Sequence, residues 1–154
     1  MADIVDADTR SRMMAAIRGK NTRPEWVIRS ALHRAGYRFR LHDRRLPGAP
    51  DLVLRQYRTV IFVHGCFWHR HSGCKYATTP ASRAGFWQEK FRANVERDRL
   101  NCQRLCSQGW RVLVVWECGI KHDPGSVVME LSDAIRYGEQ AWREIPDAPP
   151  KASV

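Results

Sequence analysis

The sequence predicts one α/β domain in which helices pack on the faces of a mixed central β-sheet. Three observations predict this fold class. Segments with helical periodicity alternate with short apolar runs, two of these runs are joined by a short polar turn, and the chain of 154 residues has the length for one compact core. We expect the domain to span 1–145 and the remainder, 146–154, to be a disordered tail.

The first half of the chain predicts two helices, a strand and a hairpin. Helical patterns occur in "DTRSRMMAAIRG" (8–19) and in "TRPEWVIRSALHRAG" (22–36), where Thr22 and Glu25 have the spacing of a capping box. "YRFRL" (37–41) alternates like a strand. The apolar runs "DLVL" and "TVIFV" on either side of "RQYR" predict an antiparallel hairpin.

The second half predicts two more helices with a strand between them. A long helix is expected over 86–107, because apolar side chains recur at steps of three and four before Gly109. "RVLVVWE" predicts a strand that is buried on both faces. "GSVVMELSDAIRYGEQAW" (125–142) is expected to form the last helix.

The charge balance predicts a polyanionic partner. Lys and Arg number 26 against 16 Asp and Glu, which gives a net charge of +10, and arginine is suited to bidentate phosphate contacts. A solvated basic surface is the alternative, but aromatics and histidines among the arginines favour nucleic acid. The sequence contains no window long enough to span a membrane and no signal-peptide core, so we expect a cytoplasmic protein.

The run "HGCFWHRHSGC" (64–74) predicts a metal site. Its Cys66, His71 and Cys74 are spaced as C-x4-H-x2-C, and Cys118 after the buried strand is the candidate fourth ligand of a structural zinc site. The alternative is buried free cysteines beside a surface histidine. For the remaining pair, Cys102 and Cys106, we expect two small buried residues on an apolar helix face.

Two carboxylates and two histidines outside this ligand set are candidates for catalysis. Asp51 opens a buried strand, where it either caps a turn or holds Mg²⁺ beside a phosphate. Asp98 falls on the apolar stripe of the long helix, so it needs a partner, either a histidine or a neighbouring arginine. His64 and His69 are candidate general bases.

At this point the motifs resemble those of the very-short-patch-repair (Vsr) endonucleases. The resemblance covers residues 5–120 and is carried, in the same order, by "LPGAPDLVL", "VIFVHGCFWHRH", "FWQEK", "NVERDR" and "GWRVLVVWEC". It implies a restriction-endonuclease-like fold and nicking of one strand of double-stranded DNA, 5′ of the thymine in T:G mismatches that arise when 5-methylcytosine deaminates. It also implies a bacterial enzyme that acts as a monomer, with mismatch-repair proteins as possible partners.

The resemblance further implies roles for individual residues. The catalytic Mg²⁺ would be held by Asp51 and the main-chain carbonyl of Val63, His69 would be the general base oriented by Asp98, His64 would assist at the phosphate, and Glu25 would support the water shell of the metal. The zinc ligands would be Cys66, His71, Cys74 and Cys118. The residues that insert beside the mismatch would be Phe67, Trp68, Trp87 and Met14, the last on the DNA-contacting helix at 8–19.

Two departures qualify this carry-over. Related nucleases place Glu-x-Lys on the strand after the aspartate, whereas this chain has "VIFVH", so a histidine has to replace the lysine. Compared with the family pattern, this chain has one additional residue between His71 and the next cysteine, close to Gly73. The alternatives to a mismatch nuclease are a sequence-specific nuclease for paired DNA and a zinc-stabilised DNA-binding module without catalysis, in which Phe67 and Trp68 only cover the metal site.

Overall fold

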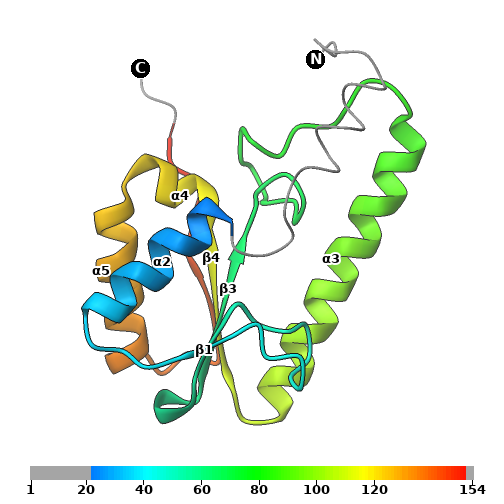
Figure 1. Ribbon diagram of the computed structural model, residues 1–154. Helices are drawn as coiled ribbons and strands as arrows, with labels where there is room; N and C mark the ends of the chain where they lie inside the picture. Colours follow the sequence, from blue (N-terminus) through cyan, green and yellow to red (C-terminus); the bar gives the residue numbers. More distant parts are fainter. Residues whose placement is uncertain (1–21, 152–154) are drawn as a thin grey trace.

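A five-stranded mixed sheet lies between two layers of helices (Figure 1). The computed structural model describes residues 22–151, so the predicted helix at 8–19 and the last three residues lie outside the described part. The strand order is β1 (Arg40–Leu41), β2 (Leu52–Leu54), β3 (Thr59–His64), β4 (Arg111–Trp116) and β5 (Trp142–Ile145). The first three strands pair antiparallel, and β3, β4 and β5 run parallel.

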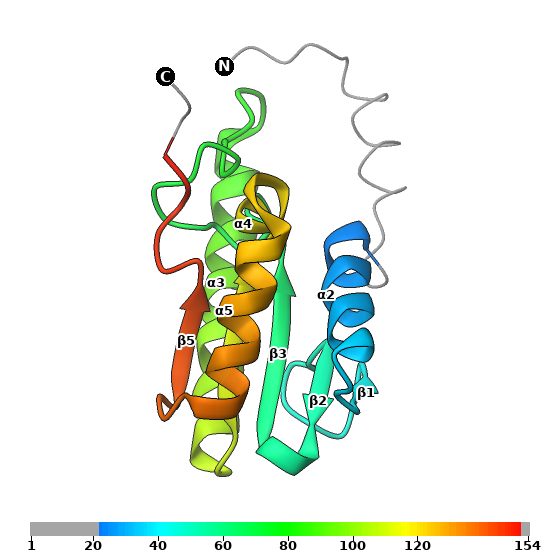
Figure 2. The same cartoon turned by 90° about the vertical axis from the view of Figure 1, so that its left-hand side faces the viewer.

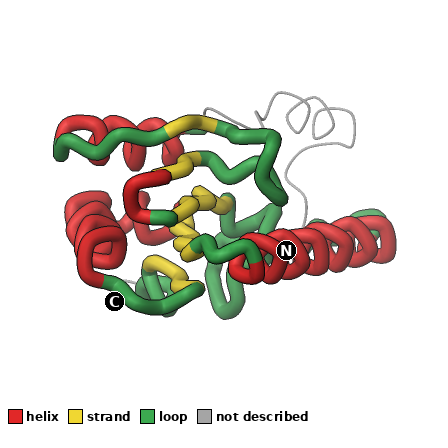
Figure 3. The backbone as a smooth tube through the Cα atoms, turned by 90° about the horizontal axis from the view of Figure 1, so that it is seen from below, coloured by secondary structure: helices red, strands yellow, loops and turns green. Residues whose placement is uncertain are grey.

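One face of the sheet is covered by α2 (Arg23–Arg34) and α5 (Pro124–Tyr137), with the short α4 (Glu117–His122) at their upper end (Figure 2). Their apolar side chains form one core with Ile61 and Leu113 of the central strands. The opposite face packs against the carboxyl-terminal part of α3 (Ala84–Ser107), through Leu105 and the alternate strand residues Val60 and Val112. Figure 3 shows the resulting three layers from below.

Local sequence signals account for most of these elements. The Thr22 side chain accepts a hydrogen bond from the backbone N–H of Glu25, which satisfies one donor at the start of α2. The hairpin of β2 and β3 is confirmed, with a single turn of 3₁₀-helix, η1 (Arg55–Tyr57), between the strands. The strand β4 is confirmed as buried on both faces. The strand at "YRFRL" is shorter than predicted and keeps only Arg40–Leu41.

The prediction of one last helix over 125–142 is wrong at its carboxyl-terminal end. The helix α5 ends at Tyr137, where the Arg111 guanidinium donates to the carbonyls of Ala134 and Ile135 and so satisfies the final turn. Trp142 instead begins β5, which extends the sheet next to β4. The short helix α4, which follows β4 directly, was not predicted from the sequence.

The helix α3 extends beyond the sheet (Figure 1). Leu105 is buried against the sheet, whereas Val95 in the middle of the helix is 43% exposed although it lies on the predicted apolar stripe. Trp87 and Phe91 are buried again, because a loop from the end of β3 packs against the amino-terminal half of the helix. None of the helices in the described residues combines the length and hydrophobicity needed to span a membrane.

Candidate functional site

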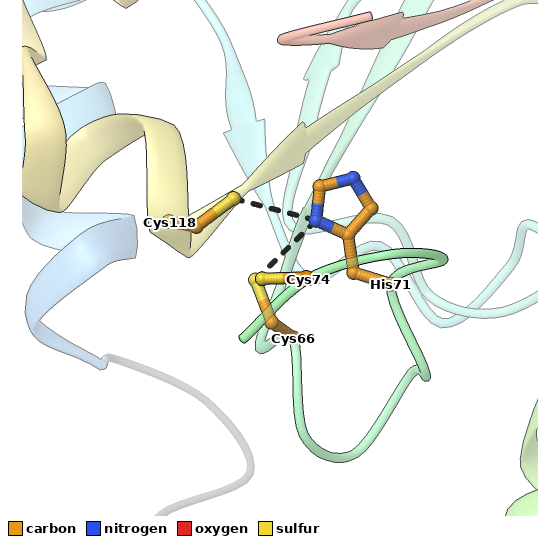
Figure 4. Close-up of side chains that lie close together, drawn as sticks. All are labelled: Cys66, His71, Cys74 and Cys118. Atoms are coloured by element: carbon orange, nitrogen blue, oxygen red, sulfur yellow. Dashed lines mark hydrogen bonds between the residues drawn. The ribbon is translucent and has the colours of Figure 1, made fainter. Parts of the chain in front are cut away.

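The loop after β3 carries a cluster of three cysteines and a histidine. Figure 4 shows Cys66, His71 and Cys74 on this loop and Cys118 reaching them from the start of α4. All four are buried, and their potential ligand atoms lie within 4.8 Å of one another. The Nδ1 atom of His71 lies 3.3 Å from Cys118 Sγ and 3.7 Å from Cys66 Sγ, so it is the ring nitrogen directed at the sulfurs.

Backbone hydrogen bonds shape this loop into a cradle. The N–H of His71 donates to the Cys66 carbonyl, and the N–H of Cys74 donates to the His71 carbonyl. Gly73 has a φ of +71°, a conformation that glycine adopts readily, and it turns the chain so that Cys74 reaches the cluster. The additional residue near Gly73 is therefore compatible with a closed four-residue set.

Burial keeps the side chains of the cluster in their neutral forms when no cation is bound. Burial raises the pKa of the Cys66 thiol well above its ordinary value and raises the pKa of Cys118 to about 11. Burial also lowers the pKa of His71, which keeps the imidazole neutral with its lone pair available. A divalent ion would reverse the preference of the thiols, since the thiolate is the form that binds metal. A Cys₃His set is typical of structural zinc sites.

A cleft of about 590 Å³ lies between the ends of β2 and β3 and the middle of α3. All the residues predicted for catalysis or Mg²⁺ binding except Glu25 line its walls, namely Asp51, Val63, His64, His69 and Asp98, together with Arg97 and Asn101 of α3. The loop before β2 closes one side of it, where Gly48 has a φ of +76° and a Cβ would lie 2.9 Å from Asn101 Nδ2. The structure therefore brings residues of the loop before β2, the end of β3 with the loop after it, and α3 to one cavity.

Asp51 is held at the inner end of this cleft. Its Oδ2 accepts a hydrogen bond of 2.7 Å from the backbone N–H of Val63, which ties the carboxylate to β3. Burial, reinforced by the charge of Glu25 and opposed by the Val63 hydrogen bond, raises the Asp51 pKa to about 6. A carboxylate that is costly to ionise without a cation is suited to binding one.

His69 forms a pair with Asp98. The Nδ1–H of His69 donates to Asp98 Oδ2 at 2.6 Å, which leaves Nε2 as the ring atom that can accept a proton. The prediction that Asp98 needs a partner is thus met by a histidine and not by a neighbouring arginine. Asp98 comes from α3 and His69 from the loop, so the pair connects two segments that are 29 residues apart.

His64 lies directly against His69. The two rings stack with their centroids 3.8 Å apart and an interplanar angle of 3°. Burial lowers the pKa of His64 well below its ordinary value, and the nearby charges of His69 and Arg97 lower it further. His64 is therefore neutral at physiological pH, and its contact with His69 restricts the orientation of that ring.

His42, which was not predicted from the sequence, forms a further cluster with Glu25 and Asp51. The Nε2 atom of His42 contacts the Glu25 carboxylate and lies 3.8 Å from Asp51 Oδ1. The backbone N–H of His42 donates to the backbone carbonyl of Asp51. Glu25 lies in the first turn of α2 and is only 2% exposed, so it meets Asp51 through His42 and does not line the cleft itself. No local pattern could have identified His42, because its partner lies 17 residues upstream on α2.

The predicted inserting aromatics form one cluster between the loop and α3. The ring of Phe67 contacts the rings of Trp68, Trp87 and Phe91, with centroids 5.0 to 5.9 Å apart. Trp68 also approaches Trp87 at 6.1 Å, and Lys90 Nζ lies 5.6 Å above its ring. In this structure the three predicted residues therefore pack against one another. Met14, the fourth predicted residue, lies outside the described residues.

The remaining cysteines are less buried than predicted. Cys102 and Cys106 are partly exposed and line a second cavity of about 440 Å³ on the other side of the His69–Asp98 pair. Burial of the thiol raises the Cys102 pKa to about 11. These two cysteines lie apart from the metal cluster, as expected, but not in a closed core.

Comparison with known proteins agrees with this arrangement. The family described as DNA mismatch endonuclease Vsr matches residues 2–75. The chain is 50% identical over 121 residues to the DNA mismatch endonuclease Vsr of Escherichia coli, a match that covers 79% of this chain and 77% of the relative. It is 46% identical over 135 residues to the type II nicking enzyme V.XorIIP of Xanthomonas oryzae, covering 88% of this chain and 98% of the relative.

A third relative is similar over its whole length. The type II nicking enzyme V.NmeAIP of Neisseria meningitidis is 42% identical over 141 residues, which is 88% of this chain and 100% of the relative. The similarity to these relatives extends over most of the chain, including the segments that form the cleft and the cysteine cluster. The chain therefore belongs to the Vsr family of DNA mismatch endonucleases.

Proposed function

We propose that this endonuclease nicks one strand of duplex DNA on the 5′ side of the thymine in a T:G mismatch, with Mg²⁺ as catalytic ion and Zn²⁺ as structural ion. It would act as a monomer on a restriction-endonuclease-like fold. The observation that carries the proposal is the His69–Asp98 pair, which faces the same cleft as the Asp51 carboxylate. A proton acceptor and a hard oxygen ligand in one cleft are what phosphodiester hydrolysis requires.

The donor set around Asp51 fits Mg²⁺. Carboxylate and main-chain carbonyl oxygens are preferred ligands, and the hydrogen bond from Val63 N–H to Asp51 supports the use of the neighbouring Val63 carbonyl. When bound there, Mg²⁺ would activate water and offset charge on the leaving oxygen. Glu25, which lies beside Asp51 through His42, would hold water around the ion.

The histidines would manage the proton. His69 Nε2 would accept a proton from the attacking water, while Asp98 at Nδ1 holds the ring in the required tautomer and stabilises the imidazolium that forms. His64 stacks on this ring and, as a neutral imidazole, would donate a hydrogen bond to the phosphate. This division of roles replaces the lysine of related nucleases.

Zinc fits the second donor set and would position the recognition residues. Cys66, His71, Cys74 and Cys118 form a Cys₃His set, which suits tetrahedral zinc. Phe67, Trp68 and His69 lie between the first two ligands, so the ion would fix the aromatic cluster relative to the base. Phe67, Trp68 and Trp87, with Met14 from the other groove, would insert beside the poorly stacked T:G pair.

The test is a nicking assay on duplexes that contain one T:G pair within a library of randomised flanks. We expect Mg²⁺-dependent cleavage of the thymine strand 5′ of the mismatch, and much slower cleavage of the matched T:A and C:G duplexes. Asp51→Ala should abolish cleavage and retain binding. Equal rates on paired DNA would support a sequence-specific nuclease, and absence of cleavage in every flank would refute the proposal.

A further inference from the structure

The cluster of Glu25, His42 and Asp51 is a second potential metal site at the cleft. Each residue offers one ligand atom, and these atoms lie within 4.8 Å of one another. The described residues contain two other such clusters, the Cys₃His set and the His64–His69–Asp98 group. The cluster with Glu25 differs from both because it combines two carboxylates with one imidazole.

The fold holds the three side chains from three separate segments. Glu25 is in the first turn of α2, His42 is in the loop after β1, and Asp51 directly precedes β2. His42 adopts a φ of +47°, which is uncommon for a residue with a Cβ. Its backbone N–H donates to the backbone carbonyl of Asp51 at 3.2 Å. This backbone conformation directs the ring at both carboxylates.

The two oxygens of Asp51 have different neighbours. Oδ2 accepts from the Val63 N–H, on the β3 side, while Oδ1 lies 3.8 Å from His42 Nε2. One carboxylate can therefore contact one ion on the side of Val63 and another on the side of His42. A carboxylate that bridges two ions is common in nucleases with two-metal sites.

Charge and geometry both favour a cation at this position. Two carboxylates lie close together here, with Glu25 only 2% exposed, and a divalent ion would neutralise both. Neighbouring ligands of an octahedral ion lie about 3 Å apart, given metal–ligand distances of about 2.1 Å. Small rotations of side chains already in contact with each other would reach that spacing.

We infer that His42 Nε2 is a direct ligand of a divalent transition-metal ion, in a site completed by Glu25 and Asp51. Imidazole nitrogen favours transition metals, whereas Mg²⁺ prefers an all-oxygen shell. The cleft therefore binds Mn²⁺ more tightly than Mg²⁺, and the difference depends on His42. The inference rests on the proposed function only in taking Asp51 as a metal ligand.

The test is binding of Mn²⁺ to the full chain with its zinc site loaded. Electron paramagnetic resonance measures the affinity, and pulsed measurements detect ¹⁴N modulation from a directly bound imidazole. We expect this modulation in the unaltered protein and its loss in His42→Gln, with Mn²⁺ affinity lowered by about tenfold or more and Mg²⁺ affinity little changed. His33→Gln, which changes an exposed histidine at the end of α2, should behave like the unaltered protein.

Other outcomes separate the inference from the proposed function. If ¹⁴N modulation persists in His42→Gln, or if this variant loses Mn²⁺ and Mg²⁺ affinity equally, His42 only positions Glu25 and the inference is wrong. If modulation depends on His42 but no T:G duplex is nicked, the metal site stands and the proposed function fails. Should His42→Gln not fold with its zinc, Glu25→Gln must weaken Mn²⁺ binding and keep the modulation; unchanged Mn²⁺ affinity would then refute the inference.

Discussion

The His69 imidazole donates to Asp98 across 2.6 Å and so joins the cysteine-rich loop to the middle of α3. The loop also carries the metal cluster and the aromatic residues Phe67 and Trp68. A displacement of the loop would therefore move the proton acceptor and the recognition surface together. This coupling makes the Asp98 carboxylate the first target for mutation.

Asp98→Asn is expected to lower the single-turnover nicking rate by about 10² to 10⁴-fold, because the amide neither fixes the His69 tautomer nor stabilises its charged form. DNA affinity, measured by fluorescence anisotropy, should not fall, since the change removes no positive charge. The matched control is Glu96→Gln on the same helix, where the acid is exposed and pairs with Arg99. A normal rate for Asp98→Asn would exclude the assigned role.

The stability of the protein should depend on pH through Asp51. Its pKa rises from 3.8 to about 6 on folding, so the folded state binds the proton more tightly than the unfolded state. Stability is therefore lost as pH rises from 3.8 toward 6, and above that pH the penalty is about 3 kcal/mol. Asp51→Asn should remove this penalty in Mg²⁺-free, zinc-loaded protein.

Chemical denaturation between about pH 5 and about pH 7 measures the effect. The variant should gain stability over the unaltered protein as the pH rises. Asp43→Asn is the control, because hydrogen bonds from Arg45 lower the Asp43 pKa to about 2, so its stability difference should stay constant over this range. A constant difference for Asp51→Asn as well would contradict the prediction.

Cys118→Ser should remove the bound metal and destabilise the fold. We expect about one metal equivalent in the purified unaltered chain and a content close to zero in the variant, and the free energy of unfolding should drop by about 4 kcal/mol or more. The loop would lose its connection to α4, so nicking should fall as well. Cys106→Ser, which lies outside the cluster, should retain the metal; equal metal loss in both variants would refute the assignment.

Trp68→Ala should weaken binding to a T:G duplex by about 10 to 100-fold, because an inserted aromatic contributes about 1–3 kcal/mol of stacking. Binding to a matched duplex should change much less, and zinc content should stay at one equivalent. Tyr137→Ala, at the exposed end of α5, removes an aromatic ring away from the cleft and serves as control. Equal losses on both duplexes would show that Trp68 contributes only general affinity.

The fold was predictable wherever a local pattern was strong. The cap at Thr22, the hairpin around "RQYR" and the uniformly apolar β4 follow from interactions within a few residues. The strand β5 was missed because only its pairing with β4 favours an extended conformation, in a four-residue segment with two charged side chains and no strong local pattern. The end of α5 depends on Arg111, which is distant in the sequence.

The residue types and their spacing set the chemistry that is available: a short run with closely spaced cysteines and histidines, a carboxylate at the start of a strand, and Asp98, which needs a partner because it lies on an apolar stripe. Which of these groups meet depends on the three-dimensional packing of the chain. It paired Asp98 with His69, stacked His64 on the same ring, and brought His42 between Glu25 and Asp51. The spacing of residues in the sequence predicts contacts within one loop or one helical turn. Contacts between distant segments cannot be predicted in this way, because they depend on the packing free energy summed over the whole core.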